Sequence, residues 1–158
     1  HNLELIGAAA DIFHTVLVST GAAKWEEVRS LINRVGSDNV KLMHCVSTYP
    51  CPPDKINLPR MDELKKLVPN VGYSGHYVGI DDAIAAICRG ATFIEKHFTI
   101  DQDLPGRDNK FSILPNDLHH IAKFRDIYEL MNIDRGLDLQ KCEMDIYNNY
   151  RGRWSKNG

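Results

Sequence analysis

Apolar residues along the chain alternate between short strand-like runs and longer stretches with helical spacing. The strand-like runs are Val16 to Ser19, Val40 to Ser47, Val71 to Ser74 and Ala91 to Thr99. The amphipathic stretches are Lys24 to Val35, Met61 to Leu67, Asp81 to Arg89 and Pro115 to Met131. This order predicts β-α units in which parallel strands are joined by right-handed helical crossovers rather than by hairpins.

Four such units are half of an eight-fold barrel, which needs about 250 residues. We therefore predict an α/β fold of the (β/α)₈ TIM-barrel type, of which this chain covers about four β-α units. The pattern alone also permits a small open α/β sheet. We expect residues 1–135 to form the barrel half. Residues 136–158 are a polar extension of unknown role, ending Tyr150-Arg151-Gly152-Arg153-Trp154.

Composition narrows the class of protein. Hydrophobic residues make up 43% and charged residues 25% of the 158 residues, and the formal net charge is -2, without a basic stripe for nucleic acid. No apolar run approaches the roughly 20 residues that span a bilayer. Two disulfides among the four cysteines would be possible, but we expect a cytoplasmic enzyme with reduced thiols. The chain begins at His1 rather than at a methionine, so we expect the native start to lie upstream.

Polar side chains occur where each predicted strand ends. The pairs, in chain order, are Ser19 with Thr20, Ser47 with Tyr49, Ser74 with His76, and Glu95 with His97. Functional groups of α/β sheets and barrels collect at the carboxyl ends of parallel strands. We therefore place a candidate site at this edge of the sheet.

Strand alternation divides these residues between two faces. Glu95 and His97 point the same way, as do Ser74 and His76, whereas His44 lies on the opposite face of its strand. Because His76 and His97 end adjacent strands, their imidazoles could converge on one divalent ion, with Glu95 as a ligand or as the group that orients one. Separate hydrogen-bonded histidines are the alternative.

Lys96 offers a competing chemistry, because Schiff-base aldolases keep their nucleophilic lysine on a barrel strand. Alternation, however, sends Lys96 to the face opposite Glu95 and His97, which favours a structural or peripheral lysine. The turn-rich, charged segment Asp101 to Lys110 follows the fourth strand. We expect it to lie over the same edge, and a solvated loop is the alternative.

Together these residues resemble the N-acetylneuraminate (sialic acid) synthase family. The similar segments, in order, are Ser19-Thr20-Gly21, Met43 to Pro52, Gly72-Tyr73-Ser74-Gly75-His76, and Ile94-Glu95-Lys96-His97-Phe98-Thr99 followed by Gly106-Arg107-Asp108. They run over about three quarters of the chain, from Asn2 to Leu118. The resemblance implies a complete barrel in which this chain supplies strands five to eight.

The resemblance also implies a function. The expected reaction is the condensation of phosphoenolpyruvate with an N-acetylmannosamine-like amino sugar, giving a nonulosonate and phosphate. It assigns a divalent metal, Mn²⁺ or Mg²⁺, to His76 and His97. The remaining assignments are Ser19 and Ser74 to the phosphate, Ser47, Tyr49 and Asp108 to the amino sugar, and Glu95 beside the metal, with Glu95 and Asp108 as candidates for proton transfer.

The resemblance also bears on completeness, on assembly and on the choice of sugar. The phosphate-binding lysines of the family come from earlier strands, so we expect the isolated fragment to be inactive. The resemblance also implies a homodimer for the full-length protein. The identity of the amino sugar stays open, because Ser47, Tyr77 and Asn109 depart from the commonest family pattern. A Schiff-base pyruvate aldolase using Lys96 and a non-catalytic, sugar-binding or assembly half-barrel are the rival functions.

Overall fold

The computed structural model describes residues 2–152. His1, and Arg153 and Trp154 of the polar ending, lie outside the described residues. The described part consists of two units, one up to Ile127 and one from Tyr128, so that the division falls near the end of the helix Pro115–Met131. The first unit contains the whole sheet and every candidate site residue.

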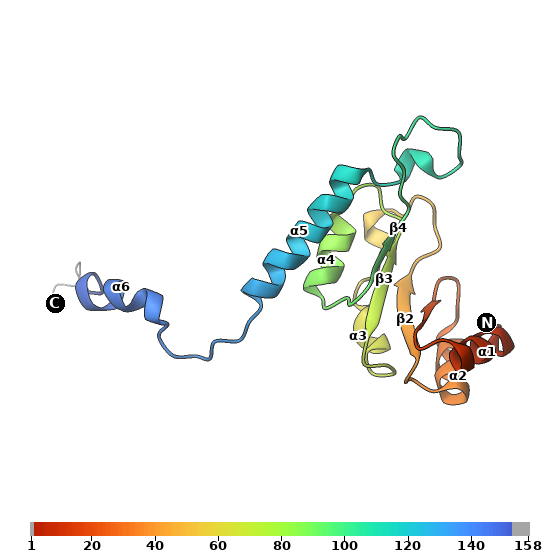
Figure 1. Ribbon diagram of the computed structural model, residues 1–158, viewed down its shortest axis with the longest axis horizontal. Coiled ribbons are helices and arrows are strands. Elements are labelled where there is room, and N and C mark those ends of the chain that lie inside the picture. Colours follow the sequence, from red (N-terminus) through yellow and green to blue (C-terminus); the bar gives the residue numbers. More distant parts are fainter. Residues whose placement is uncertain (1, 153–158) are drawn as a thin grey trace. The chain divides into compact units, whose positions relative to one another are not determined.

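The sheet of the first unit has four parallel strands that lie side by side in chain order (Figure 1). They are β1 (Val16–Ser19), β2 (Val40–Cys45), β3 (Val71–Gly75) and β4 (Ile94–Lys96). Each pairs in parallel with the next, so the prediction of β-α units without hairpins is confirmed. The result is a curled sheet of the kind that forms half of an α/β barrel.

The fourth strand is shorter than we predicted, because Ala91 to Thr99 contains only the three ladder residues Ile94–Lys96. β4 has β3 as its strand neighbour, and their last registered pair is Gly75 with Lys96. After Lys96 the chain no longer pairs with β3 and pairs with Ile113 instead, whose N–H donates to the His97 carbonyl at 2.8 Å. The second strand also ends early, at Cys45, which leaves Ser47 in the following loop.

The helices are α1 (Leu3–Ile12), α2 (Trp25–Val35), α3 (Arg60–Leu64), α4 (Asp81–Cys88), α5 (Pro115–Met131) and α6 (Met144–Asn149). Short 3₁₀ turns occupy Pro53–Lys55, Asn109–Phe111 and Lys141–Glu143. α1 was not predicted; it is capped by Asn2, whose side chain accepts the Leu5 N–H at 3.0 Å, and it contains no fully buried residue. Among residues 2–152, no helix is both long enough and apolar enough to cross a membrane.

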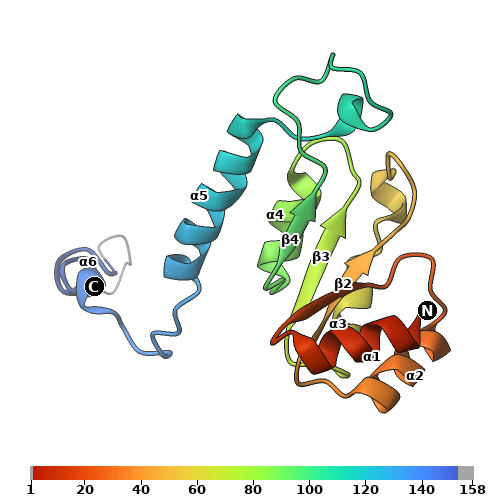
Figure 2. The ribbon, with the colours of Figure 1, turned by 45° about the vertical axis from the view of Figure 1, so that its right-hand side comes forward.

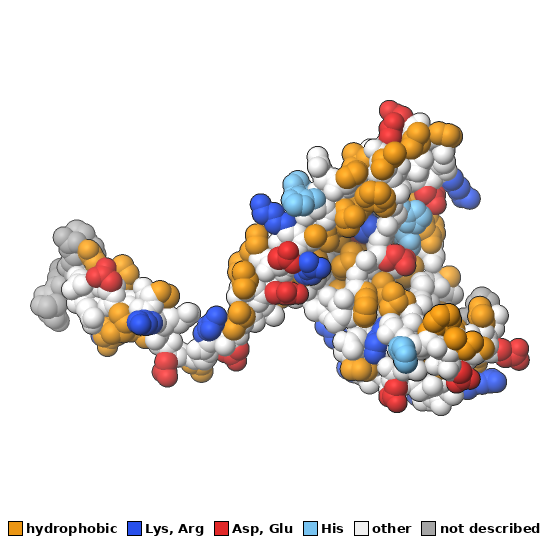
Figure 3. Space-filling view, in the orientation of Figure 1, with side chains coloured by type: hydrophobic (Ala, Val, Ile, Leu, Met, Phe, Trp, Pro, Cys, Tyr) orange, Lys and Arg blue, Asp and Glu red, His pale blue; other side chains and the backbone are white. Residues whose placement is uncertain are grey.

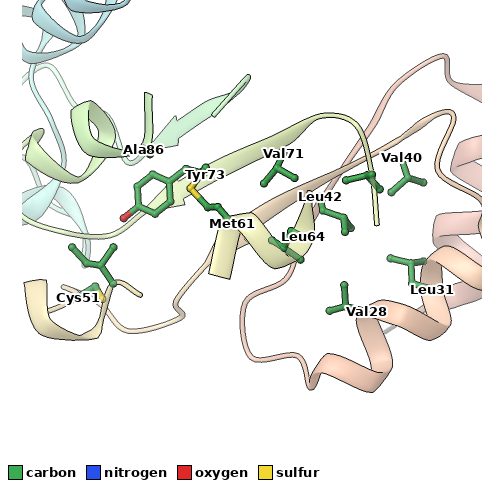
Figure 4. Close-up of a cluster of buried hydrophobic side chains, with 12 residues drawn as sticks. Val28, Leu31, Val40, Leu42, Cys51, Met61, Leu64, Val71, Tyr73 and Ala86 are labelled. Atoms are coloured by element: carbon green, nitrogen blue, oxygen red, sulfur yellow. The ribbon is translucent and has the colours of Figure 1, made fainter. Parts of the chain in front are cut away.

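The core of the first unit lies between one face of the sheet and helices α2 and α3, whose apolar side chains meet those of β2 and β3 (Figure 4). We call this the back face. Its central residues are Val28 and Leu31 of α2, Met61 and Leu64 of α3, Val40 and Leu42 of β2, and Val71 and Tyr73 of β3. Figure 2 shows α1 and α2 together beside β1. Charged side chains of both signs are interspersed with apolar ones on the surface shown in Figure 3.

His44 is a buried imidazole that lies beside this core. Its side chain is on the back face, as alternation predicted, and the residue is fully buried. The ring Nε2 lies 2.8 Å from the Ile56 carbonyl oxygen and therefore donates to it, whereas Nδ1 has no hydrogen-bond partner among the described residues. Burial lowers the pKa of His44 below its ordinary value, since a charged imidazole would lose its hydration.

A lowered histidine pKa makes stability depend on pH with a definite sign. Above pH 6.5 His44 is neutral in both states and contributes no slope. Below pH 6.5 the unfolded chain takes up a proton that the folded chain refuses, so the free energy of unfolding decreases as the pH decreases, by up to about 1.4 kcal/mol per pH unit. The decrease levels off once the pH passes the folded-state pKa.

We predict that His44→Gln makes the stability less dependent on pH between 6.5 and 5. Glutamine can still donate an N–H toward the Ile56 carbonyl but does not titrate in this range. Melting curves at half-unit pH steps would show a smaller slope for the variant than for the original protein. Identical slopes would contradict the assignment of a neutral buried imidazole.

Candidate active site

The face of the sheet opposite the core carries a row of polar side chains at the carboxyl ends of three strands. We call it the front face. Cys45 of β2 is registered with Ser74 of β3, and Ser74 with Glu95 of β4. The buried Ser74 hydroxyl donates to Glu95 Oε1 at 2.7 Å. This hydrogen bond confirms that both side chains point to the same face.

A second row lies two residues further along each chain segment, at Ser47, His76 and His97. Because the strands are parallel and registered, the same step of two residues brings both histidines to neighbouring positions. Their ring centroids are 5.2 Å apart, with an angle of 74° between the ring planes. The structure therefore brings His76 and His97 together, as the sequence predicted for a shared ion.

His76 is held in a defined orientation. Its Nδ1 lies 3.0 Å from the Val46 carbonyl oxygen, so Nδ1 carries the proton and the lone pair is at Nε2. The residue is 6% exposed, and burial is the main cause that lowers the pKa of its imidazole. A neutral ring with a free Nε2 is the form of histidine that coordinates metals.

His97 has a carboxylate in the corresponding place. Its Nδ1 is 3.6 Å from Asp108 Oδ2, and its ring packs against Phe111 with centroids 5.1 Å apart. Asp108 belongs to the charged segment that follows β4, so this segment does return to the edge of the sheet. A carboxylate that accepts the ring N–H orients metal-binding histidines in other proteins, and Asp108 lies just beyond hydrogen-bond distance of His97.

Tyr49 covers the two imidazoles from the loop after β2. Its ring centroid is 4.2 Å from that of His76 and 5.8 Å from that of His97. The loop is fixed to β3 because the Cys51 N–H donates to the His76 carbonyl at 2.8 Å. Tyr49 itself is half-exposed, so its hydroxyl-bearing ring forms a wall of the site that a ligand can reach.

The two remaining predicted residues lie toward β1. Ser47 Oγ is 3.8 Å from Cys45 Sγ, which ties it loosely to the front-face row. Ser19 is exposed at the end of β1, and its hydroxyl accepts the Gly21 N–H at 3.2 Å. Among the described residues no contact joins Ser19 to either histidine, so the structure does not bring it into the central cluster.

Sequence reasoning overlooked Phe111. This buried ring packs against His97 and lies 6.4 Å from the Tyr49 ring, centroid to centroid. The alternation of Phe111, Ser112 and Ile113 is a short strand-like signal, and Ile113 indeed forms a parallel bridge with Phe98. This apolar alternation was the only local signal for the segment, and it does not show that Phe111 would contact His97.

Two imidazoles can share a divalent metal only when their rings lie within a limited distance of each other. An imidazole nitrogen binds a first-row ion at about 2.0–2.1 Å, so the centroids of two rings sharing an ion are at most roughly 6 Å apart. The observed 5.2 Å fits that limit. Within residues 2–152, no cluster of three or more histidine, cysteine or carboxylate side chains is arranged to hold a metal. The ring separation is thus compatible with an ion held by two imidazoles, whose other ligands would come from substrate, water or the rest of the protein.

Comparison with known proteins assigns the family. The sequence model of the NeuB family matches residues 1–133. The chain is 35% identical over 137 residues to the N,N'-diacetyllegionaminic acid synthase of Campylobacter jejuni, covering 82% of this chain and 41% of that protein. It is 35% identical over 138 residues to the N-acetylneuraminate-9-phosphate synthase of Drosophila melanogaster, covering 84% and 37%. The chain therefore belongs to the NeuB family.

A solved structure agrees with this assignment. The crystal structure of an N-acetylneuraminic acid (sialic acid) synthetase from Leptospira borgpetersenii, in complex with citrate, matches with a TM-score of 0.81 at 31% identity. The match covers 96% of this chain and 55% of that one. The chain thus spans about two fifths of the length of the curated relatives and about half of the solved structure.

The packing around Ser47 leads to a prediction. A Cβ atom at Gly21 would lie 2.3 Å from Ser47 Oγ and 2.7 Å from Cys45 Sγ, closer than real contacts allow. We expect Gly21→Ala to displace Ser47 and to lower the free energy of unfolding by about 1–3 kcal/mol.

Gly7→Ala in α1 is the matched control. A Cβ there meets nothing within 4 Å, so we expect a gain of up to about 1 kcal/mol from helix propensity. Denaturant unfolding of both variants measures the two effects. A Gly21→Ala protein as stable as the Gly7→Ala protein would show that the front face is not packed as described.

Proposed function

We propose that this chain supplies strands five to eight of a (β/α)₈ synthase that condenses phosphoenolpyruvate with an N-acylated amino sugar. The supporting observation is the pair of imidazoles of His76 and His97, placed by registered strands beside the Ser74–Glu95 hydrogen bond. Membership in the NeuB family and the names of the relatives support this reaction class. The whole activity requires the barrel half that completes the site.

In this proposal His76 and His97 hold a divalent metal, Mn²⁺ or Mg²⁺, through Nε2. A bound ion of this kind would act as a Lewis acid toward the aldehyde oxygen of the open-chain sugar. The Val46 carbonyl accepts the Nδ1–H of His76, which leaves the Nε2 lone pair of that ring available. In the proposal the Asp108 carboxylate, 3.6 Å from Nδ1 of His97, would move closer to accept the Nδ1–H of His97 in the same way. Tyr49 and Phe111 shield the rings on one side.

The phosphate of phosphoenolpyruvate is assigned to Ser19 and Ser74. The Ser74 hydroxyl, which donates to Glu95 in this structure, would turn its proton toward a phosphate oxygen. That change leaves Glu95 free to accept a hydrogen bond or a proton from the sugar. Two hydroxyl groups cannot balance a phosphate dianion, so the cationic side chains must come from the other half of the barrel.

The amino sugar is assigned to Ser47, Tyr49 and Asp108, which lie on loops around the two imidazoles. The reaction forms a bond between the enol carbon of phosphoenolpyruvate and the sugar aldehyde carbon, and the aldehyde oxygen gains a proton. Water adds to the cationic carbon that bears the phosphate ester, and breakage of the carbon–oxygen bond then releases phosphate. Glu95 and Asp108 are the carboxylates in place for these proton transfers.

The rival aldolase depends on Lys96 as a nucleophile. Its ammonium lies behind the sheet in an ion pair with Asp82, and the Lys96 side chain is only 4% exposed. A Schiff base needs a neutral amine that reaches the substrate, so the geometry argues against this function. A non-catalytic half-barrel would differ from the synthase by binding ligand without releasing phosphate, even in the complete protein.

Completeness and assembly are part of the proposal. Within residues 2–152, β1 and β4 each have one strand neighbour, and apolar side chains such as Leu17 and Phe98 are about half-exposed there. Unpaired edges of this kind need a covering partner. We expect the other barrel half to cover them, the complete protein to be a homodimer, and these 158 residues alone to release no phosphate from phosphoenolpyruvate.

The proposal predicts a difference between histidines in the complete protein. We expect His76→Ala and His97→Ala each to lower metal-dependent phosphate release from phosphoenolpyruvate and N-acetylmannosamine by at least 100-fold, because one of two nitrogen ligands is lost. Phosphate would be measured with and without Mn²⁺. Borohydride added with pyruvate should leave Lys96 unmodified.

The controls are His119→Ala and His120→Ala, which remove exposed imidazoles from the first half of α5. We expect both to retain activity within about twofold, since surface substitutions away from a site have small effects. Equal losses in all four variants would contradict the metal assignment, and covalent trapping at Lys96 would favour the aldolase.

A further inference from the structure

Lys96 makes three hydrogen bonds on the back face, although it lies between two candidate site residues of the front face. Its Nζ is 2.9 Å and 3.0 Å from the two carboxylate oxygens of Asp82, at the start of α4. The third bond, of 2.8 Å, goes to the Tyr77 carbonyl oxygen. All three ammonium protons are therefore used, and the side chain is almost completely buried.

The Asp82 carboxylate is also held by several hydrogen bonds. Its side chain is fully buried, and besides Lys96 it accepts the Tyr73 hydroxyl at 2.9 Å and the Ala83 N–H at 2.8 Å. Gly75 leaves the necessary space, because a Cβ atom there would lie 2.3 Å from Asp82 Oδ2. The ammonium thus cannot shift without breaking several contacts in a tightly packed region.

The connections of this network lead directly to the two imidazoles. Lys96 is the last residue of β4 and directly precedes His97. Tyr77 directly follows His76, beyond the end of β3. The registered pair Gly75 and Lys96 is the last rung between these strands. Beyond that rung, the bond from Lys96 Nζ to the Tyr77 carbonyl is a further link between the segments that carry the two rings.

We propose that Lys96 is a positioning residue that sets the separation of the His76 and His97 imidazoles by clamping the backbone after β3 to β4 and α4. The inference rests on the proposed metal-binding function of these histidines. It gives the lysine of the Glu-Lys-His segment a role other than nucleophile. Asp82 acts with it, by fixing the ammonium and compensating its charge.

The experiment uses the complete protein and compares three variants. Lys96→Met removes the ammonium but retains an unbranched stem. Lys96→Met combined with Asp82→Leu and Tyr73→Phe replaces the whole network by apolar groups of similar volume, so that no buried charge or phenol is left unpaired. Lys66→Met is the control, because Lys66 pairs with Glu63 on the surface of the protein.

Two readouts separate positioning from stability. Mn²⁺ affinity would be measured by electron paramagnetic resonance titration, and crystal structures would give the distance between the two ring centroids. We expect Lys96→Met and the triple variant to bind Mn²⁺ at least tenfold more weakly, the range found for groups that orient metal ligands. The ring separation should depart from 5.2 Å by more than 1 Å, whereas Lys66→Met should change neither quantity.

The triple variant keeps the test decisive if Lys96→Met does not fold. A folded triple variant with unchanged Mn²⁺ affinity and unchanged ring separation would overturn the inference, because it would show that the network only stabilises the core. If the original protein binds no Mn²⁺, or if His76→Ala binds it equally well, the assignment of a metal to His76 and His97 in the proposed function is wrong. The ring separation in the triple variant then decides the positioning role by itself.

Discussion

The parallel register between β3 and β4 is the constraint on which the candidate site depends. Ser74 stands opposite Glu95, and each strand continues for the same two residues to a histidine. A shift of one residue in this register would send one imidazole to the back face, away from the other. The hydrogen bond from Ser74 to Glu95 on the front and the ion pair of Lys96 with Asp82 on the back both oppose such a shift.

The two faces of the sheet have different roles: the front face carries the candidate site, and the back face supports it through packing. The front face carries hydroxyl, carboxylate and imidazole groups, most of them partly exposed, while the back face packs against α2 and α3. Polar groups on the back face are fixed rather than reactive. His44 holds the Ile56 carbonyl of the loop that also carries Tyr49, and Lys96 holds the Tyr77 carbonyl next to His76. Each therefore supports a front-face residue from behind.

The sequence predicts much of this arrangement, because strand periodicity is strict and chain order limits parallel sheets to few topologies. Sequence periodicity predicted the four strands and the helices α2, α3, α4 and α5, and it assigned His44 and Lys96 to the correct face. It could not give the partner of Lys96, since Asp82 is paired only through the packing of α4 on β4. The end of β4 and the position of Phe111 depend on a bridge between Phe98 and Ile113, which is set by tertiary contacts rather than by local pattern.

The most direct test of the account is the position of a metal in crystals of the complete protein grown with Mn²⁺. Anomalous diffraction locates manganese independently of any assumption about ligands. The account predicts one peak between the two strands, within about 2.0–2.3 Å of a ring nitrogen of both His76 and His97. A fully occupied manganese ion elsewhere, with no peak between these imidazoles, would contradict it.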